Sequence, residues 1–124
     1  MIQPLIGHIA IVTGASRERG IGTAICRALA KAGADILFTH WGRYDETMSW
    51  GAEQEWPDRL MDELKQTGVR AHHLEVDLAD PSTPSRIFDR ALEVLGRPSI
   101  LVNNATHSNE GGFRELSAES LDAH

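Results

Sequence analysis

Ile9-Ala-Ile-Val-Thr-Gly-Ala-Ser-Arg-Glu-Arg-Gly-Ile-Gly22 joins a short apolar run to a glycine-rich turn. The apolar run, residues 9–12, contains β-branched side chains and predicts a strand buried on both faces of a parallel sheet. Gly14, Gly20 and Gly22 lack a Cβ, so the backbone there can take unusual dihedral angles and a bulky anion can approach its amide groups. Ser16 adds a hydroxyl donor, and Arg17 and Arg19 add positive charge.

The segment after the turn has helical periodicity. Its apolar positions are expected to form the buried face of a helix: Ile21, Ala24, Ile25, Ala28, Leu29 and Ala32. The glycines then precede a helix N-terminus, where free amide groups and the positive end of the helix dipole attract anions. The pattern therefore favours a pyrophosphate site. A plain structural turn is the alternative, whereas an ATP or GTP P-loop is excluded because Gly20 is followed by Ile21 and not by Lys.

Two further segments support a comparison with a known family. Thr13-Gly14-Ala15-Ser16 and Gly20-Ile21-Gly22 resemble the cofactor fingerprint of the short-chain dehydrogenases/reductases, with two extra residues inserted before Gly-Ile-Gly. Ile100-Leu-Val-Asn-Asn-Ala105 is similar to a second motif of that family, and Asp77 stands where the family has an adenine-contacting acid. The resemblance extends from about residue 6 to the end of the chain. The motifs are most similar to those of the 3-oxoacyl-carrier-protein reductase-like members.

The end of the second predicted strand, Ile36–Thr39, bears on the choice of cofactor. The strand is followed by His40-Trp41-Gly42-Arg43, with no acid before Asp45. Folds of this kind that select NAD carry an acid here for the ribose hydroxyls, whereas a 2′-phosphate requires positive charge. Arg17 and Arg43 are candidates to face that phosphate, so NADP(H) is favoured and NAD(H) remains possible. Alternatively, His40 and Trp41 pack over the sheet edge and the arginines are solvated.

Two more strands are expected to end in polar residues of the same site. The third, 71–76, leads to Asp77-Leu78, which would contact the adenine, unless Asp77 only caps the following turn. The fourth, 99–102, leads to Asn103, Asn104 and Ala105 beside the ribose. Thr106 replaces the glycine usual in the family, so the backbone there is expected to differ. His72 and His73 would point to opposite faces of the strand, and no metal site is predicted.

The remaining elements complete a doubly wound α/β fold of the Rossmann type. Helices are expected from Pro57 to Gly68 and from Asp80 to Gly96, the latter with an inner face of Ile87, Ala91, Val94 and Leu95. Trp50 and Trp56 are expected to hold the first of these helices against the sheet. With right-handed crossovers the four strands take the order 3-2-1-4, within one NAD(P)-binding domain spanning 1–124.

Composition narrows the functional classes. Twelve Lys and Arg against eighteen Asp and Glu give a formal charge of −6, which argues against nucleic-acid and membrane partners. A cytoplasmic location is expected, since the start of the chain does not resemble a signal peptide. The single cysteine, Cys26, is predicted to be buried and inert.

The resemblance implies hydride transfer between a nicotinamide and a ketone or 3-oxoacyl substrate, by an enzyme that is a homo-oligomer. The family's proton donor is a tyrosine with a lysine four residues later, but Met48 follows the only tyrosine, Tyr44, at that spacing. No catalytic residue is therefore assigned. The chain is expected to be the truncated, cofactor-binding half of a reductase and inactive by itself. The alternative is a non-catalytic nucleotide-binding or interaction module that pairs through its open sheet edge.

Overall fold

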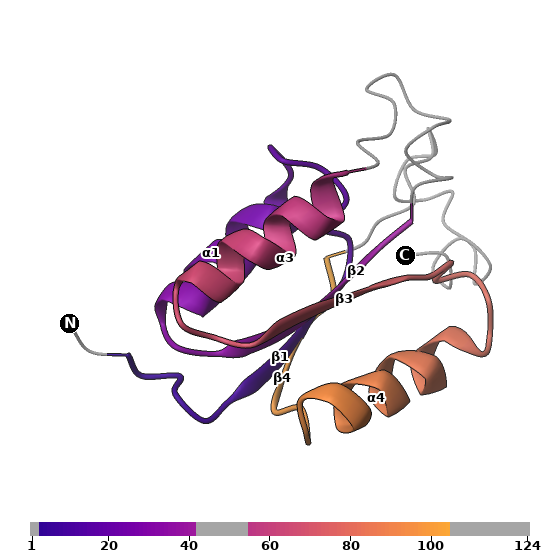
Figure 1. Ribbon diagram of the computed structural model, residues 1–124. Helices are drawn as coiled ribbons and strands as arrows, with labels where there is room; N and C mark the ends of the chain where they lie inside the picture. Colours follow the sequence, from indigo (N-terminus) through magenta and orange to yellow (C-terminus); the bar gives the residue numbers. More distant parts are fainter. Residues whose placement is uncertain (1–2, 42–54, 105–124) are drawn as a thin grey trace, which may run out of the picture.

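The computed structural model describes residues 3–41 and 55–104. Within these two ranges, seven elements follow one another in the order of a repeated strand–helix unit (Figure 1): β1 (Ile9–Val12), α1 (Ile21–Lys31), β2 (Asp35–His40), α3 (Trp56–Gln66), β3 (Ala71–Glu75), α4 (Thr83–Val94) and β4 (Ile100–Val102). Each strand lies where the sequence predicts one, with ends that differ by at most one residue. None of the helices in these two ranges is long and apolar enough to cross a membrane.

The sheet has the predicted order. Its strands are arranged β3-β2-β1-β4, and each adjacent pair is parallel. Ala10 on β1 is in register with Ile36 on β2 and with Ile100 on β4, so β1 lies inside the sheet with a partner on each side. Because all four strands run in the same direction, their carboxyl ends meet at one edge, which is where ligands bind in open α/β sheets.

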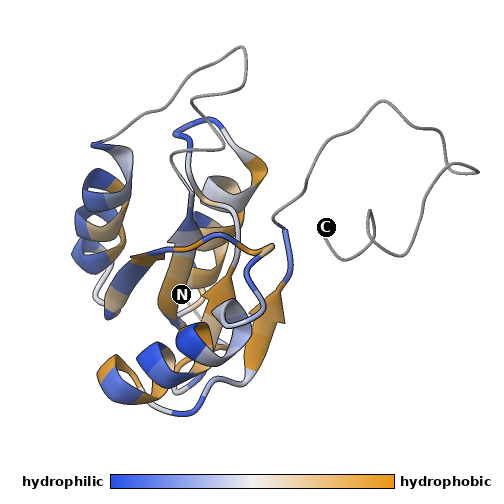
Figure 2. Cartoon of the chain, turned by 90° about the vertical axis from the view of Figure 1, so that its right-hand side faces the viewer, coloured by the Kyte–Doolittle hydropathy of each residue, from blue (hydrophilic) through white to orange (hydrophobic). Residues whose placement is uncertain are grey.

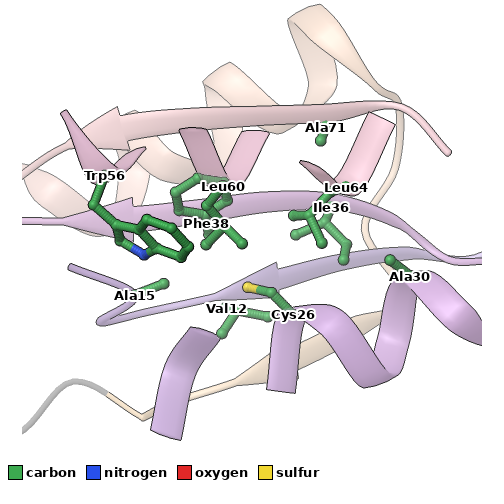
Figure 3. Packing of buried hydrophobic residues seen from close by; sticks show 10 residues of the cluster. All are labelled: Val12, Ala15, Cys26, Ala30, Ile36, Phe38, Trp56, Leu60, Leu64 and Ala71. Atoms are coloured by element: carbon green, nitrogen blue, oxygen red, sulfur yellow. The ribbon is translucent and has the colours of Figure 1, made fainter. Parts of the chain in front are cut away.

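Helices cover both faces of this sheet. In Figure 1, α1 and α3 lie together on one face and α4 lies on the other. The strands are mainly apolar, and the helices turn hydrophilic residues outward (Figure 2). The larger apolar cluster joins α1 and α3 to the sheet (Figure 3) and consists of Val12, Ala15, Cys26, Ala30, Ile36, Phe38, Trp56, Leu60, Leu64 and Ala71.

The opposite face is closed by α4. Its cluster of buried residues consists of Ile9, Ile11, Leu37, Val76, Ile87, Ala91 and Leu95. Alternate residues of the strands therefore enter different cores, as Ile36 and Leu37 do on β2. The predicted inner face of α4 is confirmed for Ile87, Ala91 and Leu95, and Val94 is partly buried against the same cluster.

The predicted buried face of α1 is wrong in part. Ile21, Ala24 and Ala28 are exposed, whereas Ile25 and Leu29 are partly buried against the larger cluster. The fully buried positions are occupied by smaller side chains: Gly22, Thr23, Cys26 and Ala30. The helical period is correct, but the buried stripe is displaced around the helix, because α1 packs closely on the sheet and only small residues can occupy the contact.

Trp56 holds α3 against α1 and the sheet, as predicted, while Trp50 lies outside the described residues. The indole of Trp56 is buried, and its Nε1 donates to Thr23 Oγ1 at 3.2 Å. The guanidinium groups of Arg27 and Arg59 lie 5.6 Å and 5.3 Å from the centroid of its ring. Nearby, burial raises the pKa of the Cys26 thiol to about 12, so this thiol stays protonated at neutral pH and is a poor nucleophile.

Replacing Leu64 by Ala tests the larger core. Leu64 is fully buried between α3 and the sheet, so its truncation should lower the free energy of unfolding by about 3 kcal/mol. Leu92→Ala is the matched control, because Leu92 is 56% exposed on α4 and its loss should change stability by no more than about 0.5 kcal/mol. Urea denaturation followed by circular dichroism measures both. Equal losses for the two variants would contradict this packing.

Candidate cofactor-binding site

Residues from four separate segments meet at the carboxyl edge of the sheet. Each segment follows one strand of the parallel sheet, so the topology alone brings them together. All but one of the predicted site residues lie in the described segments: Gly14, Ser16, Arg17, Gly20, Ile21, Gly22, His40, Trp41, Asp77, Leu78, Asn103 and Asn104. Ala105 lies outside the described residues, as do Arg43 and Thr106.

The turn after β1 is fastened to the end of β2. The amide groups of Gly14 and Ala15 both donate to the carbonyl oxygen of Thr39, at 3.1 and 2.8 Å. Gly14 has φ of +81°, a conformation that L side chains rarely adopt, and this lets the chain leave the strand sharply. These two amides therefore serve the turn itself. The first-turn amides of α1 are candidates to face an anion, because they have no partner within the helix.

Gly22 allows α1 to approach the turn closely. A Cβ at this position would lie 2.4 Å from the carbonyl oxygen of Gly14 and 2.9 Å from Nδ2 of Asn104. Gly20 differs, because its φ is −79° and the nearest atom to an added Cβ is the Arg17 carbonyl oxygen at 3.4 Å. The bare backbone at Gly22 is thus required by packing, whereas that at Gly20 leaves the surface of the helix end open.

The N-terminus of α1 has the character of an anion site. Gly20 is its N-cap residue and supplies no side-chain cap, and the first turn contains no acidic residue. The first amides of a helix have no partner within the helix, and the positive end of its dipole lies here. Ile21, 72% exposed, places an apolar side chain beside these amides. Helix ends of this kind are common sites for phosphate groups.

Hydrogen bonds of polar side chains hold the turn in position. Ser16 Oγ accepts from the amide of Trp41 at 3.2 Å, which joins the turn to the residue after β2. Thr23 Oγ1 donates to the carbonyl oxygen of Arg17 and accepts from Trp56. The backbone at Arg17 is therefore anchored from inside the core, which fixes where its guanidinium group can reach.

Thr13 and Asn104 connect the turn to the end of β4. Thr13 Oγ1 lies 3.3 Å from Asn103 Oδ1 and accepts from the amide of Asn104 at 3.0 Å. Asn104 Nδ2 donates to the carbonyl oxygen of Gly14 at 3.2 Å. Sequence reasoning assigned no bracing role to Thr13 or Thr39. Their roles could have been predicted from their position at the end of an apolar strand, because a buried threonine hydroxyl requires a hydrogen-bond partner.

Asp77 makes the turn-capping contact that was the alternative to cofactor binding. Its Oδ1 accepts from the amide of Ala79 at 2.9 Å, and its carbonyl oxygen accepts from Thr83 Oγ1. The hydrogen bond from Ala79 engages one of the two carboxylate oxygens. Leu78 is partly buried against the α4 cluster. A structural role for Asp77 is thus present, and contact with an adenine remains a prediction.

Two hydrogen bonds at the end of β2 join three side chains, and the sequence did not predict them. His40 Nε2 lies 3.0 Å from His73 Nδ1, and His73 Nε2 lies 2.7 Å from Oδ1 of Asp58 on α3. Within residues 3–41 and 55–104, no group of three or more His, Cys, Asp or Glu side chains is arranged to hold a metal ion. The sequence could not predict these hydrogen bonds, because they depend on the register of β2 with β3 and on the position of α3.

Comparison with known proteins places the chain in a family. The model of the short chain dehydrogenase family matches residues 8–124. The chain belongs to this family. Membership confirms the resemblance in the cofactor fingerprint, and the parallel order β3-β2-β1-β4 is the Rossmann-type arrangement found among its members.

Three similar proteins bear on the short-chain dehydrogenase site. The chain is 40% identical over 116 residues to the uncharacterized oxidoreductase YjdA of Bacillus subtilis, covering 94% of this chain and 43% of that protein. It is 37% identical over 99 residues to an L-rhamnose 1-dehydrogenase (NADP(+)) of Thermoplasma acidophilum, covering 80% and 34%. A blue fluorescent protein from a metagenomic library, solved with NADPH, superposes with a TM-score of 0.78 at 34% identity, covering 98% and 47%. The chain thus spans less than half the length of these proteins.

Adding a methyl group at Gly22 should disturb the closest contact of the site. We expect Gly22→Ala to lower the free energy of unfolding by about 2 kcal/mol, because the backbone must move away from the Gly14 carbonyl oxygen. Gly20→Ala is the matched control and should cost less than about 1 kcal/mol. Thermal and urea unfolding of the two variants measure this difference in the free energy of unfolding. A Gly22→Ala protein as stable as Gly20→Ala would refute the close approach.

Proposed function

We propose that this chain supplies the NADP(H)-binding half of a short-chain dehydrogenase that transfers hydride between a nicotinamide and a ketone or 3-oxoacyl substrate. The observation that carries the proposal is the N-terminus of α1, which has no side-chain cap and no acid in its first turn. Family membership and a structural neighbour solved with NADPH support the same assignment.

The residues of this chain would then act by binding and orienting the dinucleotide. The first-turn amides of α1 and Ser16 would hold the pyrophosphate, with Gly20, Ile21 and Gly22 keeping its approach open. Asp77 and Leu78 would contact the adenine, and the segment 103–105 would lie beside the ribose next to the nicotinamide. When bound, the cofactor supplies the hydride. This chain's part is to fix where the nicotinamide lies relative to a substrate.

A preference for NADP(H) follows from the charges near β2. The residue at the end of β2 is His40, where folds that select NAD carry an acid, and Arg17 is held in the adjacent turn. An L-rhamnose dehydrogenase among the relatives is named for NADP(+). Together these observations favour a 2′-phosphate over a free ribose hydroxyl.

The proton donor and the substrate pocket would come from sequence outside this chain. The chain spans 43% of YjdA and 34% of the rhamnose dehydrogenase, so more than half of such a protein lies beyond it. An interaction module that pairs through the sheet edge is the second candidate. Leu101, 60% exposed on β4, favours it, because an edge strand with an apolar surface attracts a partner.

Cofactor titration tests the main proposal. The protein that carries this chain should enhance and shift NADPH fluorescence on binding, and it should oxidise NADPH when a suitable ketone or 3-oxoacyl thioester is added. An isolated 124-residue chain should bind the cofactor at most and give no turnover. Absence of binding to both NADPH and NADH would leave the interaction module standing.

Arg17→Ala tests the 2′-phosphate assignment. If Arg17 contacts this group, the substitution should raise the Kd for NADPH by about tenfold or more and that for NADH by less than about threefold, since a charged hydrogen bond is lost only with NADPH. Arg19→Ala removes the same charge from an exposed position of the same turn and serves as the control. Equal losses for both cofactors in Arg17→Ala would remove the argument for NADP(H).

A further inference from the structure

The hydroxyl of Thr23 joins the glycine-rich turn to α3. Thr23 is the third residue of α1 and is fully buried. Its Oγ1 donates to the carbonyl oxygen of Arg17 at 2.5 Å and accepts from Nε1 of Trp56 at 3.2 Å. An indole N–H only donates and a carbonyl oxygen only accepts, so the direction of both hydrogen bonds is fixed. The Thr23–Trp56 pair therefore links the first residue of α3 to the backbone of the turn.

The carbonyl group that this pair holds belongs to the last part of the turn before α1. The Arg17 carbonyl oxygen also accepts from the amide of Gly20 at 3.2 Å, so residues 17–20 form a closed turn that ends at the N-cap of α1. The Arg17 side chain lies against this turn, since its Nε is 3.9 Å from where a Cβ of Gly20 would lie. The turn carries two residues more than the family's fingerprint, and a longer turn loses more conformational entropy when it is ordered. The Thr23 hydroxyl supplies an additional anchor for it.

The first-turn amides of α1 take their position from this closed turn. The first hydrogen bond within the helix runs from the amide of Ala24 to the carbonyl oxygen of Gly20 at 3.2 Å, so the amides of residues 21–23 precede it. These amides are the ones that we propose to bind the diphosphate. Their direction follows from the backbone at Gly20, whose own amide is bound to the Arg17 carbonyl oxygen. A change at that carbonyl group therefore changes the geometry of the proposed site.

Trp56 is held firmly at the other end of the link. Its indole is 3% exposed and belongs to the cluster that also contains Ala15 of the turn (Figure 3). The guanidinium groups of Arg27 on α1 and Arg59 on α3 lie over its ring, and Arg27 is paired with Glu63 of α3 at 2.7 Å. Both helices thus fix the indole, and the position of α3 is transmitted to the turn.

We propose that Thr23 and Trp56 are positioning residues of the dinucleotide site, which hold the turn before α1 in the conformation that binds the diphosphate. The inference rests on the proposed dinucleotide function. Neither side chain touches the cofactor, because both are buried, and each acts through the Arg17 carbonyl group. A turn that is already fixed loses less conformational entropy when an anion binds than a loose turn does. Loss of either hydrogen bond should therefore weaken binding, although no group that contacts the cofactor is removed.

The test measures the Kd of NADH and NADPH in the protein that carries this chain. NADH lacks the 2′-phosphate, so its affinity reports on the diphosphate site separately from any contact of the Arg17 side chain with that group. Thr23→Val keeps the shape of the side chain and removes the hydroxyl, and it should raise the Kd of NADH about fivefold, as expected for one lost hydrogen bond. Trp56→Phe removes the indole N–H and should raise this Kd about threefold. Thr23→Ser keeps a hydroxyl and should bind NADH within about twofold of the wild type.

A double-mutant cycle shows whether the two residues act as one unit. Trp56→Phe should raise the Kd no further in a Thr23→Val protein, because the hydroxyl through which the indole acts is already absent. Thr67→Val is the matched control. It removes a hydroxyl that donates to the Leu64 carbonyl oxygen at 2.7 Å near the opposite end of α3, and it should keep the wild-type Kd.

The free energy of unfolding is measured in the same variants, because a purely structural role would lower stability and leave the affinity for NADH unchanged. A wild-type Kd for NADH in folded Thr23→Val and Trp56→Phe proteins, or losses that add in the double variant, would overturn the positioning role alone. Trp56→Phe decides between the outcomes if Thr23→Val does not fold. Failure of the wild type to bind either NADH or NADPH would instead overturn the proposed function.

Discussion

The approach of Gly22 to the carbonyl oxygen of Gly14 sets the position of α1 on the sheet. An added Cβ would lie 2.4 Å from that oxygen, so no other residue fits without a shift of the backbone. This one contact fixes where the amino end of the helix lies relative to the carboxyl ends of β1, β2 and β4. It also explains why the buried stripe of α1 consists of small residues such as Thr23, Cys26 and Ala30.

Threonine hydroxyls and carbonyl groups hold the turn once the helix is in place. Thr39 accepts from the amides of Gly14 and Ala15, and Thr13 joins the turn to Asn104. These bonds tie β1 to β2 on one side and to β4 on the other, so the turn cannot move independently of the sheet. A rigid cradle binds an anion without the loss of conformational entropy that ordering a loose loop would require.

The strands and their order could be predicted because the information is local. Apolar runs such as 9–12 and 36–39 mark buried strands, and right-handed crossovers then allow few topologies. The buried face of α1 was harder to predict, because Ile21 and Ala28 match the helical period as well as Cys26 and Ala30 do. Periodicity alone gives a stripe but does not say how closely the helix packs. Here the close contact at Gly22 selects the stripe with small side chains.

Contacts within the site follow from geometry that no single segment encodes. His40 and His73 meet because β2 and β3 pair in one register, and Asp58 reaches them from α3. A shift of one residue in that register would turn His73 to the other face and bring Leu74 or His72 into register with Phe38 in its place. Asp77 illustrates the converse, since its sequence position allowed two interpretations and favoured adenine contact, whereas the contact that the structure shows is the cap of the turn at Ala79.

Local charge outweighs net charge at the proposed anion site. The chain carries a formal charge of −6, yet charges in solution act over only about 8 Å at physiological ionic strength. Within that range lie the positive end of the helix dipole and Arg17 Nε, which is 3.9 Å from where a Cβ of Gly20 would lie, and the first turn of the helix has no acid. The dinucleotide that we propose to bind here would meet mainly the positive end of the helix.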